Sequence, residues 1–256
     1  SDITITAGQT TGTTSFTPTD DTTYEGNETG IIAIDTVSGG SATENGTQSV
    51  TITITDNESA PTVTLTSSAS SIAENAGSSL TLTATLSTAT TANVTVGIST
   101  SGTGTEGTDY GTVSDITITA GQTTGTATFT PTDDSVYEGN ETGIIAIDTV
   151  TGGSATENGT QSVTLTITEN ESAPTVTLTS SASSIAENAG SSLTLTATLS
   201  VATTANVSVA LSTSGTGTEG SGGDYATVSD ITISAGATTG TASFTPIDDS
   251  SYEGDE

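Results

Sequence analysis

The side chains that could do chemistry in this sequence are carboxylates, hydroxyls and amides. The chain holds 30 acidic residues and no Lys, Arg, His, Cys, Met or Trp. Catalysis by a Ser–His or Cys–His pair, a lysine Schiff base and a phosphate-binding P-loop are therefore excluded. The chain also lacks the nitrogen and sulfur ligands that usually bind zinc and copper. What remains is a set of oxygen ligands, which suit hard cations such as Ca²⁺ and Mg²⁺.

The carboxylates are concentrated in short segments that separate apolar stretches. Between residues 61 and 173 most of them fall in four segments, at residues 73–75, 106–110, 133–141 and 168–171. Two carboxylates about 4 Å apart repel by roughly 4 kcal/mol at an effective dielectric near 20. Because no Lys or Arg can relieve this repulsion, clustered carboxylates need a divalent cation, bound protons or separation. Several carboxylates together favour Ca²⁺ over Mg²⁺, which prefers to keep its water shell.

An internal repeat of about 113 residues organises the chain. Residues 1–60 align without gaps on residues 114–173, and 53 of the 60 positions are identical. The sequence Pro61-Thr-Val-Thr-Leu-Thr returns at Pro174. We therefore predict three segments: residues 1–60 as the C-terminal part of a first repeat, residues 61–173 as a complete repeat, and residues 174–256 as the N-terminal part of a third. The expected source is a longer array of the same unit.

Apolar residues alternate with Thr throughout the complete repeat, and this period of two is typical of half-buried strands. The alternation predicts seven strands, around residues 63–65, 80–86, 94–98, 116–118, 127–129, 145–147 and 163–167. Seven short antiparallel strands in about 113 residues indicate an all-β fold of tandem immunoglobulin-like β-sandwiches. Aromatic residues make up only 3% of the chain, so each core is expected to be thin.

Three of the acidic motifs resemble those of the Calx-β domain. They are Glu74 in Ala-Glu-Asn, the pair Asp109-Tyr110, and the Asp-Asp-x-x-Tyr-Glu-x-x-Glu pattern at residues 133–141. The resemblance covers the whole repeat and implies an immunoglobulin-like sandwich, as found in sodium–calcium exchangers and large bacterial surface proteins. In calcium-binding members of this family, the ligands come from segments like these four, clustered at the end of the domain near the next domain.

The resemblance implies a set of calcium ligands in each repeat. In the complete repeat they are Glu74, Asp109, Asp133, Asp134, Glu138, Glu141, Glu169 and Glu171. In the first repeat they are Asp20, Asp21, Glu25, Glu28, Asp56 and Glu58. In the third repeat they are Glu187, Asp224, Asp248, Asp249, Glu253 and Glu256.

Two departures from the exchanger-type pattern predict fewer or weaker sites. That pattern has three consecutive Asp residues where this chain has Asp133-Asp134-Ser135. It also ends in a run of Asp where this chain has Glu169-Asn170-Glu171. The alternative is an acidic, solvated surface that binds no metal and keeps the protein soluble.

Composition narrows the possible partners. Nucleic-acid binding needs Lys and Arg, which are absent, and an anionic membrane surface would repel a net charge of −30. No stretch approaches 18 consecutive apolar residues, so we expect no membrane insertion. Two carboxylates can hydrolyse a glycoside, but these acidic segments recur in every repeat, beside no aromatic sugar platform and no basic or His partner. We therefore predict that the chain is not an enzyme.

The prediction for function is an extracellular or cell-surface structural and adhesive array, stiffened by Ca²⁺ at its acidic loops. Its partners would be neighbouring copies of the repeat, with self-assembly into fibres. The lack of Cys fits an extracellular protein that does not depend on disulfides. Glycan attachment is expected at Asn140 and Asn27, which both precede Glu-Thr. The alternatives are a Ca²⁺-responsive regulatory module, as in the exchangers, or a glycan-coated spacer without metal.

Overall fold

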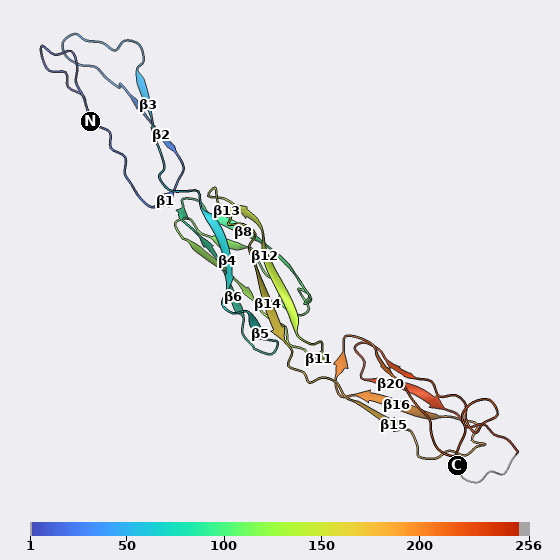
Figure 1. Ribbon diagram of the computed structural model, residues 1–256. Coiled ribbons are helices and arrows are strands. Elements are labelled where there is room, and N and C mark those ends of the chain that lie inside the picture. The colour runs from blue at the N-terminus through green and yellow to red at the C-terminus, as the bar shows by residue number, and fades with distance from the viewer. Residues whose placement is uncertain (1, 251–256) are drawn as a thin grey trace.

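A computed structural model describes residues 2–250 of the chain. Its elements are all strands, and they form three bodies that follow one another in an elongated molecule (Figure 1). This confirms the prediction of an all-β fold with tandem repeats. Among the described residues, no helix is long and apolar enough to cross a membrane.

The middle repeat is a sandwich of two sheets. The first sheet has four strands in the order β10 (Thr124–Phe129), β6 (Leu80–Leu86), β4 (Thr62–Ser67) and β13 (Thr156–Glu157). The second has five strands in the order β5 (Ser71–Ala73), β14 (Ser162–Thr168), β12 (Glu141–Thr151), β8 (Val94–Gly102) and β9 (Ile116–Ile118). All seven predicted strands are present, and the pairs among the long strands are antiparallel.

The core of the middle repeat follows from the alternation of apolar residues with Thr. In β6 the inward side chains of Leu80, Leu82, Ala84 and Leu86 are buried, and the Thr residues between them lie nearer the solvent. Successive side chains of a strand point to opposite faces, so this pattern places one whole face in the interior. Thr suits the outer face because its β-branched side chain packs well on a pleated surface.

One aromatic pair anchors this thin core beneath the acidic loops. The rings of Tyr110 and Phe129 lie 4.6 Å apart between centroids, tilted by 31°, and both side chains are buried. A Cβ atom on Gly143 would come within 2.8 Å of the Phe129 ring, so only glycine lets β12 approach the ring this closely. The pair therefore fixes Asp109, the residue before Tyr110, against the sandwich.

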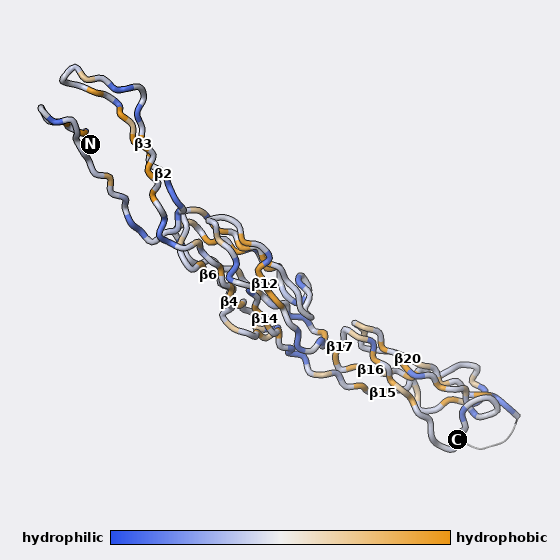
Figure 2. Tube along the Cα trace, turned by 45° about the horizontal axis from the view of Figure 1, so that its top comes forward, coloured by the Kyte–Doolittle hydropathy of each residue, from blue (hydrophilic) through white to orange (hydrophobic). Residues whose placement is uncertain are grey.

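The described part of the first repeat is an open segment with little core. It holds β1 (Thr23–Tyr24) and the hairpin strands β2 (Glu28–Ala33) and β3 (Ser49–Ile54), which pair with each other. Figure 2 shows hydrophobic stretches along β2 and β3. Ile31, Ile32 and Val50 are exposed there, because no second sheet covers them.

The described part of the third repeat has strands from both sheets of a sandwich. Its strands are β15 (Val176–Ser180), β16 (Leu193–Leu199), β17 (Ala202–Thr203), β18 (Val207–Val209), β19 (Ile231–Ile233) and β20 (Thr239–Phe244). The sheet β15-β16-β20 repeats the arrangement of β4-β6-β10, and Tyr225 and Phe244 repeat the aromatic pair at 4.7 Å. The predicted repeat boundaries, at residues 60/61 and 173/174, fall between β3 and β4 and between β14 and β15.

The structure adds short strands that the sequence pattern did not predict. These are β5, β13, β7 (Ala89–Thr90) and β11 (Val136–Tyr137), and each pairs in parallel with its partner strand. Two of these pairs join different repeats: β1 pairs with β7, and β11 pairs with β17. Their two or three residues are too few for alternation to reveal them.

Candidate metal site

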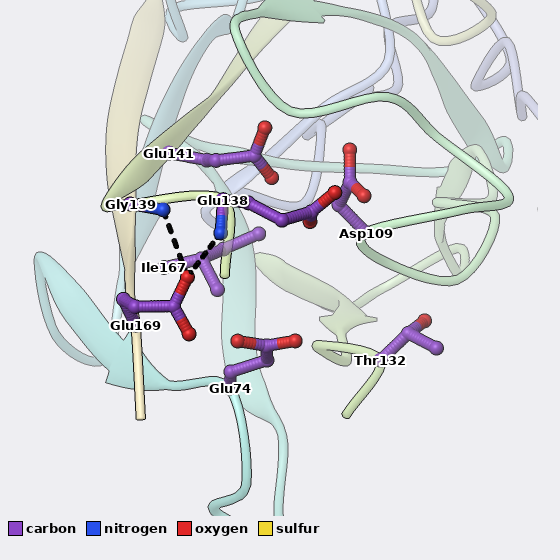
Figure 3. A pocket seen from close by; sticks show the side chains of 8 residues that line it. All are labelled: Glu74, Asp109, Thr132, Glu138, Gly139, Glu141, Ile167 and Glu169. Carbon is purple, nitrogen blue, oxygen red and sulfur yellow. Dashed lines mark hydrogen bonds between the residues drawn. The ribbon is translucent and has the colours of Figure 1, made fainter. Parts of the chain in front are cut away.

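A pocket of carboxylates lies at the end of the middle repeat, next to β11 and the third repeat (Figures 1 and 3). Its side chains come from the segments after β5, before Tyr110, after β11, at the start of β12 and after β14. The lining residues are Glu74, Asp109, Thr132, Glu138, Gly139, Glu141, Ile167 and Glu169. Residues from all four acidic segments of the repeat therefore meet at one end of the sandwich.

Three overlapping groups of carboxylates have oxygens close enough to share a cation. Within each group, one oxygen from every member lies within 4.8 Å of the others. The groups are Glu74, Asp134 and Glu138; Glu74, Glu169 and Glu171; and Asp109, Glu138 and Glu141. Among the residues that the structure describes, seven of the eight predicted ligands of this repeat are thus brought together. Asp133 belongs to none of these groups and is exposed.

Glu169 is the best-anchored carboxylate of the site. Its Oε2 accepts hydrogen bonds from the backbone N–H of Glu138 at 2.6 Å and of Gly139 at 2.8 Å (Figure 3). Its Oε1 accepts from the N–H of Asn170 and of Glu171, both at 3.0 Å. Burial alone would raise the pKa of Glu169, but the hydrogen bonds from Glu171, Glu138 and Gly139 lower it to about 2. Glu169 is therefore ionised without any cation.

Glu171 carries an oxygen that has no partner. Its Oε2 is buried and makes no hydrogen bond, whereas Oε1 accepts one from Nδ2 of Asn170 at 3.1 Å. The pKa of Glu171 is raised, first by its hydrogen bond with Glu169 and then by burial. A buried polar atom without a partner is costly and rare. Glu171 also belongs to the group with Glu74 and Glu169, in which one oxygen of each residue lies within 4.8 Å of the others.

Burial and mutual repulsion raise the pKa of two carboxyl groups of the site to about 7. Glu74 is only 7% exposed, and burial raises its pKa to about 7, with smaller contributions from the nearby charges of Glu169 and Glu171. Burial likewise raises the pKa of Glu141 to about 7, helped by the charges of Asp109 and Glu138. The pKa of Glu138 is also raised, mainly by burial. Without a cation, these groups take up protons instead of sharing the site as anions.

Backbone hydrogen bonds position the remaining carboxylates. Asp109 closes its own loop, where Oδ2 accepts the N–H of Thr105 at 2.6 Å. Asp134 caps the following turn, where Oδ1 accepts the N–H of Val136 at 2.7 Å. The N–H of Asp134 donates to Oε1 of Glu74 at 3.2 Å, which joins the two segments.

Two residues in or beside the acidic segments have roles that the sequence did not predict. Asn140 is a predicted glycan site, and its Oδ1 accepts the N–H of Glu169 at 3.0 Å, which holds this segment in place. Glu106, although acidic, takes no part in the three groups within the described chain. It accepts hydrogen bonds from the Thr100 hydroxyl at 2.6 Å and the Val113 N–H at 2.8 Å, and so stabilises the loop. The sequence alone does not distinguish an acidic residue that stabilises a loop, such as Glu106, from one that could bind a metal.

The first repeat keeps the anchoring contacts but not the cluster. Oδ2 of Asp56 accepts the N–H of Glu25 at 2.8 Å and of Gly26 at 2.5 Å, as Glu169 does in the middle repeat. Backbone hydrogen bonds, chiefly from Glu58, lower the pKa of Asp56, and the hydrogen bond with Asp56 raises that of Glu58. The other predicted ligands here, Asp20, Asp21 and Glu28, join no group of three close carboxylates in residues 2–250.

The third repeat preserves two of the positioning contacts. Oε1 of Glu187 accepts the N–H of Asp249 at 3.0 Å, like Glu74 and Asp134. Asp224 accepts hydrogen bonds from the N–H and the hydroxyl of Thr218. Asp248 is exposed beside Asp249. Two further predicted ligands, Glu253 and Glu256, lie outside the described residues.

The donor set fits a hard divalent cation. It consists of carboxylate oxygens from four segments, one buried carboxyl group and one buried oxygen without a partner. Such ligands suit cations that take many oxygens in a flexible geometry. An immunoglobulin-like sandwich with carboxylates gathered at one end thus defines a class of repeat suited to bind a hard cation between its loops.

The comparison with protein families gives this class a name. The model of the Calx-β domain matches residues 56–172 and again residues 169–256. These two matches cover most of the chain, so the chain belongs to the Calx-β family. A search among curated protein sequences found no match.

Solved structures that match this chain include three of Calx domains. The apo form of the Calx CBD1 domain is 18% identical, with a TM-score of 0.37, and the match covers 43% of this chain and 99% of that one. CBD12 from CALX1.2 is 16% identical, with a TM-score of 0.36, over 69% of this chain and 73% of that one. The calcium-binding domain CBD12 of CALX1.1 is also 16% identical, with a TM-score of 0.35, over 69% and 72%.

Proposed function

We propose that the chain is part of an extracellular structural and adhesive repeat array that binds Ca²⁺ at the end of each complete repeat. The observation that carries this proposal is the meeting of Glu74, Glu169 and Glu171 in one group, of which Glu171 has a buried Oε2 without a hydrogen-bond partner. The absence of Lys, Arg and His leaves a cation from solution as the partner for so many carboxylates. Calcium is favoured because it accepts several carboxylate ligands, whereas Mg²⁺ dehydrates reluctantly.

In the middle repeat, the seven clustered carboxylates would hold the ion or ions. Glu169 is ionised in advance by its backbone hydrogen bonds, whereas Glu74 and Glu141 would release their protons on binding. Bound Ca²⁺ would supply the positive charge that offsets the repulsion within the cluster. Asp133, which is exposed and outside the groups in the described chain, would contribute only charge.

The site lies beside the joint to the next repeat, which supports a mechanical role. Glu169 and Glu171 end the middle repeat, and Pro174 begins the third, so almost no free linker separates the two. Pro174 also restricts Ala173 to an extended backbone. An ion shared between residues 169–171 and the loop at 133–141 would tie the end of the repeat to its own loops and stiffen the joint.

The proposed surroundings are the cell surface or the extracellular space, with neighbouring copies of the repeat as partners in fibres. Asn140 and Asn27 are exposed and would carry glycans on Nδ2, while their Oδ1 atoms keep the hydrogen bonds to Glu169 and Asp56. We propose no catalytic role, no nucleic-acid partner and no insertion into a membrane.

Titration calorimetry on the full chain tests the calcium proposal. We expect heat of binding with Ca²⁺, a weaker response with Mg²⁺, and release of protons that depends on pH near 7. The Asp134→Asn variant should lose affinity because Asp134 belongs to a three-carboxylate group, and the neighbouring Asp133→Asn variant should bind nearly as the parent does. Absence of binding at millimolar Ca²⁺ would reject the proposal and favour a passive acidic spacer.

A further inference from the structure

Adjacent repeats are joined by the same two-residue bridge at both boundaries. β1 of the first repeat pairs in parallel with β7 of the middle repeat, with Thr23 opposite Ala89 and Tyr24 opposite Thr90. Between the middle and third repeats, β11 pairs with β17, with Val136 opposite Ala202 and Tyr137 opposite Thr203. The two pairs at the first joint correspond to the two pairs at the second, because the paired residues on both strands are shifted by 113 positions. Figure 1 shows β1 and β11 at these two joints.

The receiving edge of each bridge is fixed by the repeat that carries it. Thr203 is buried, its hydroxyl donates to the carbonyl of Ala205 at 2.7 Å, and its own carbonyl accepts the N–H of Gly236 at 2.8 Å. The equivalent Thr90 is 1% exposed and makes the same two bonds, to Ala92 at 2.6 Å and from Gly121 at 2.8 Å. Each edge is therefore a rigid surface and not a free loop.

Carboxylates on either side of the docking strand hold its backbone in position. In the middle repeat, Asp134 accepts the N–H of Val136, the first residue of β11, and Glu169 accepts those of Glu138 and Gly139 just after it. The first repeat repeats this arrangement. Asp21 accepts the N–H of Thr23 at 2.7 Å, and Asp56 accepts those of Glu25 and Gly26. The bridge strand is thus held from both sides at both joints.

We propose that this bridge is a docking interface between repeats, in which the acidic loop of one repeat adds a short parallel strand to the Ala-Thr edge of the next. Its partner is a neighbouring copy of the same repeat. Backbone pairing of this kind depends little on side chains, which fits the change from Thr23 to Val136 at one of the paired positions. The carboxylates that anchor the strand do so through backbone hydrogen bonds, so the bridge forms without metal.

The interface has a direction. The middle repeat offers its acidic loop at one end and its Ala-Thr edge at the other, so each repeat docks on its successor head to tail. A contact between two different surfaces can repeat from each copy to the next, and it extends into an open array unless the rotation between copies closes a ring. The short connection at residues 169–174 keeps the two surfaces at high effective concentration, so a bridge of two residues is sufficient within one chain.

Introduced cysteines can test the register directly, because the chain has none of its own. The Val136→Cys/Ala202→Cys pair places two cysteines opposite each other, where neighbouring strands lie about 4.8 Å apart. The control pair, Val136→Cys/Thr204→Cys, is offset by two residues on the same side, which is about 8 Å and too far for a disulfide. We expect rapid intramolecular oxidation of the first pair only, in EDTA as well as in Ca²⁺. Equal rates for both pairs, or a disulfide mainly between chains, would overturn the proposal.

A second variant measures what the bridge contributes. Ala202→Pro removes an N–H from the receiving strand and leaves every candidate metal ligand in place. We expect small-angle scattering of the full chain to show a more flexible joint, while calcium binding to the middle repeat is unchanged. If scattering shows the same stiffness in this variant, the bridge does not hold the joint. A chain that binds no calcium but still forms the in-register disulfide would reject the metal site and keep the bridge.

Discussion

The first and middle repeats share a sequence but not an environment. Phe16 is 46% exposed, whereas its counterpart Phe129 is completely buried. Ile5 is 58% exposed, and its counterpart Ile118 is 1% exposed. The two stretches are identical at 53 of 60 positions, so local sequence does not cause the difference. What differs is the covering half of the sandwich, formed by β4, β6 and β8 in the middle repeat, which the described part of the first repeat lacks.

The same contrast applies to the carboxylates. Asp56 and Glu169 accept equivalent backbone hydrogen bonds, because these contacts lie within the last 60 residues of a repeat. The groups of three close carboxylates in the middle repeat also need Glu74 or Asp109, which come from its earlier half. Local contacts thus form wherever the segment occurs, whereas the core and the metal site belong to the complete repeat.

The largest effect is expected from removing the aromatic side chain at these two positions. Phe129→Ala should destabilise the middle repeat by about 3–5 kcal/mol, since it leaves a cavity beside Tyr110. Phe16→Ala should change the stability of this chain by less than about 0.5 kcal/mol, because the ring is half exposed. Urea unfolding of the full chain, followed by tyrosine fluorescence, measures both. Similar losses in the two variants would mean that the first repeat has a packed core in solution.

The period-two pattern was sufficient to predict the fold of the middle repeat. The stretches around Leu80–Leu86 and Val163–Ile167 became β6 and β14, because each has one consistently apolar face. The same pattern also predicts burial for Val176 and Leu178, which are 43% and 52% exposed here. Alternation shows which face of a strand is apolar. Whether that face is covered depends on the presence of the other sheet.

The acidic segments were visible in the sequence, and the resemblance to the Calx-β domain implied that they cluster at one end of the repeat. The sequence did not show that Asp134 joins the cluster and Asp133 does not. Neighbouring residues in a turn point in different directions, and of these two only Asp134 is grouped with Glu74. The sequence also missed the role of Asn140, whose hydrogen bond to Glu169 depends on two loops that are 29 residues apart. The bridges at β1 and β11 are defined by pairing between repeats and leave no periodic signal.

Calcium should produce the next largest effect, and only in a repeat with a complete cluster. Binding at a hundredfold excess over Kd adds about 2.7 kcal/mol to the stability of the folded state. We expect the melting temperature of the middle repeat to rise by several degrees in millimolar Ca²⁺ and to fall back in EDTA. Glu138→Gln should remove most of this shift, and the equivalent Glu25→Gln in the first repeat should preserve it. Calorimetry that shows equal losses for both variants would contradict the contrast between the repeats.

A smaller effect of pH should appear in the absence of metal. The pKa values of Glu74 and Glu141 are raised from 4.5 to about 7 in the folded repeat, so the fold binds these protons more tightly than the unfolded chain does. The resulting stabilisation is complete below about pH 4.5 and is lost as the pH rises through about 7. In EDTA, the middle repeat should therefore melt at a higher temperature at about pH 5.5 than at about pH 8. The Glu74→Gln variant, neutral at every pH, should show a weaker dependence.

The smallest effect is expected from Glu169→Asp, which gives the middle repeat the residue type that the first repeat has at the equivalent position, Asp56. Asp56 of the first repeat accepts the N–H of Glu25, Gly26 and Glu58, and Glu169 accepts the three equivalent N–H groups. The shorter Asp side chain therefore makes the same contacts, and Glu169→Asp should change stability in EDTA by less than about 0.5 kcal/mol.

Glu169→Gln provides the matched control for this exchange. It keeps the length of the side chain but loses the charge, and hydrogen bonds to charged groups are stronger than those to neutral ones. The Gln variant should therefore be less stable than the Asp variant. The loss should shrink as the pH falls from about 4.5 to about 2, because the unfolded parent takes up its proton near pH 4.5 and the folded parent only near pH 2. Calcium affinity should distinguish the two further, because Asp retains an anionic ligand beside Glu171 and Gln does not. If Glu169→Asp proved as destabilising as Glu169→Gln, side-chain length and not charge would set the anchor, and the two repeats would differ even in their local contacts.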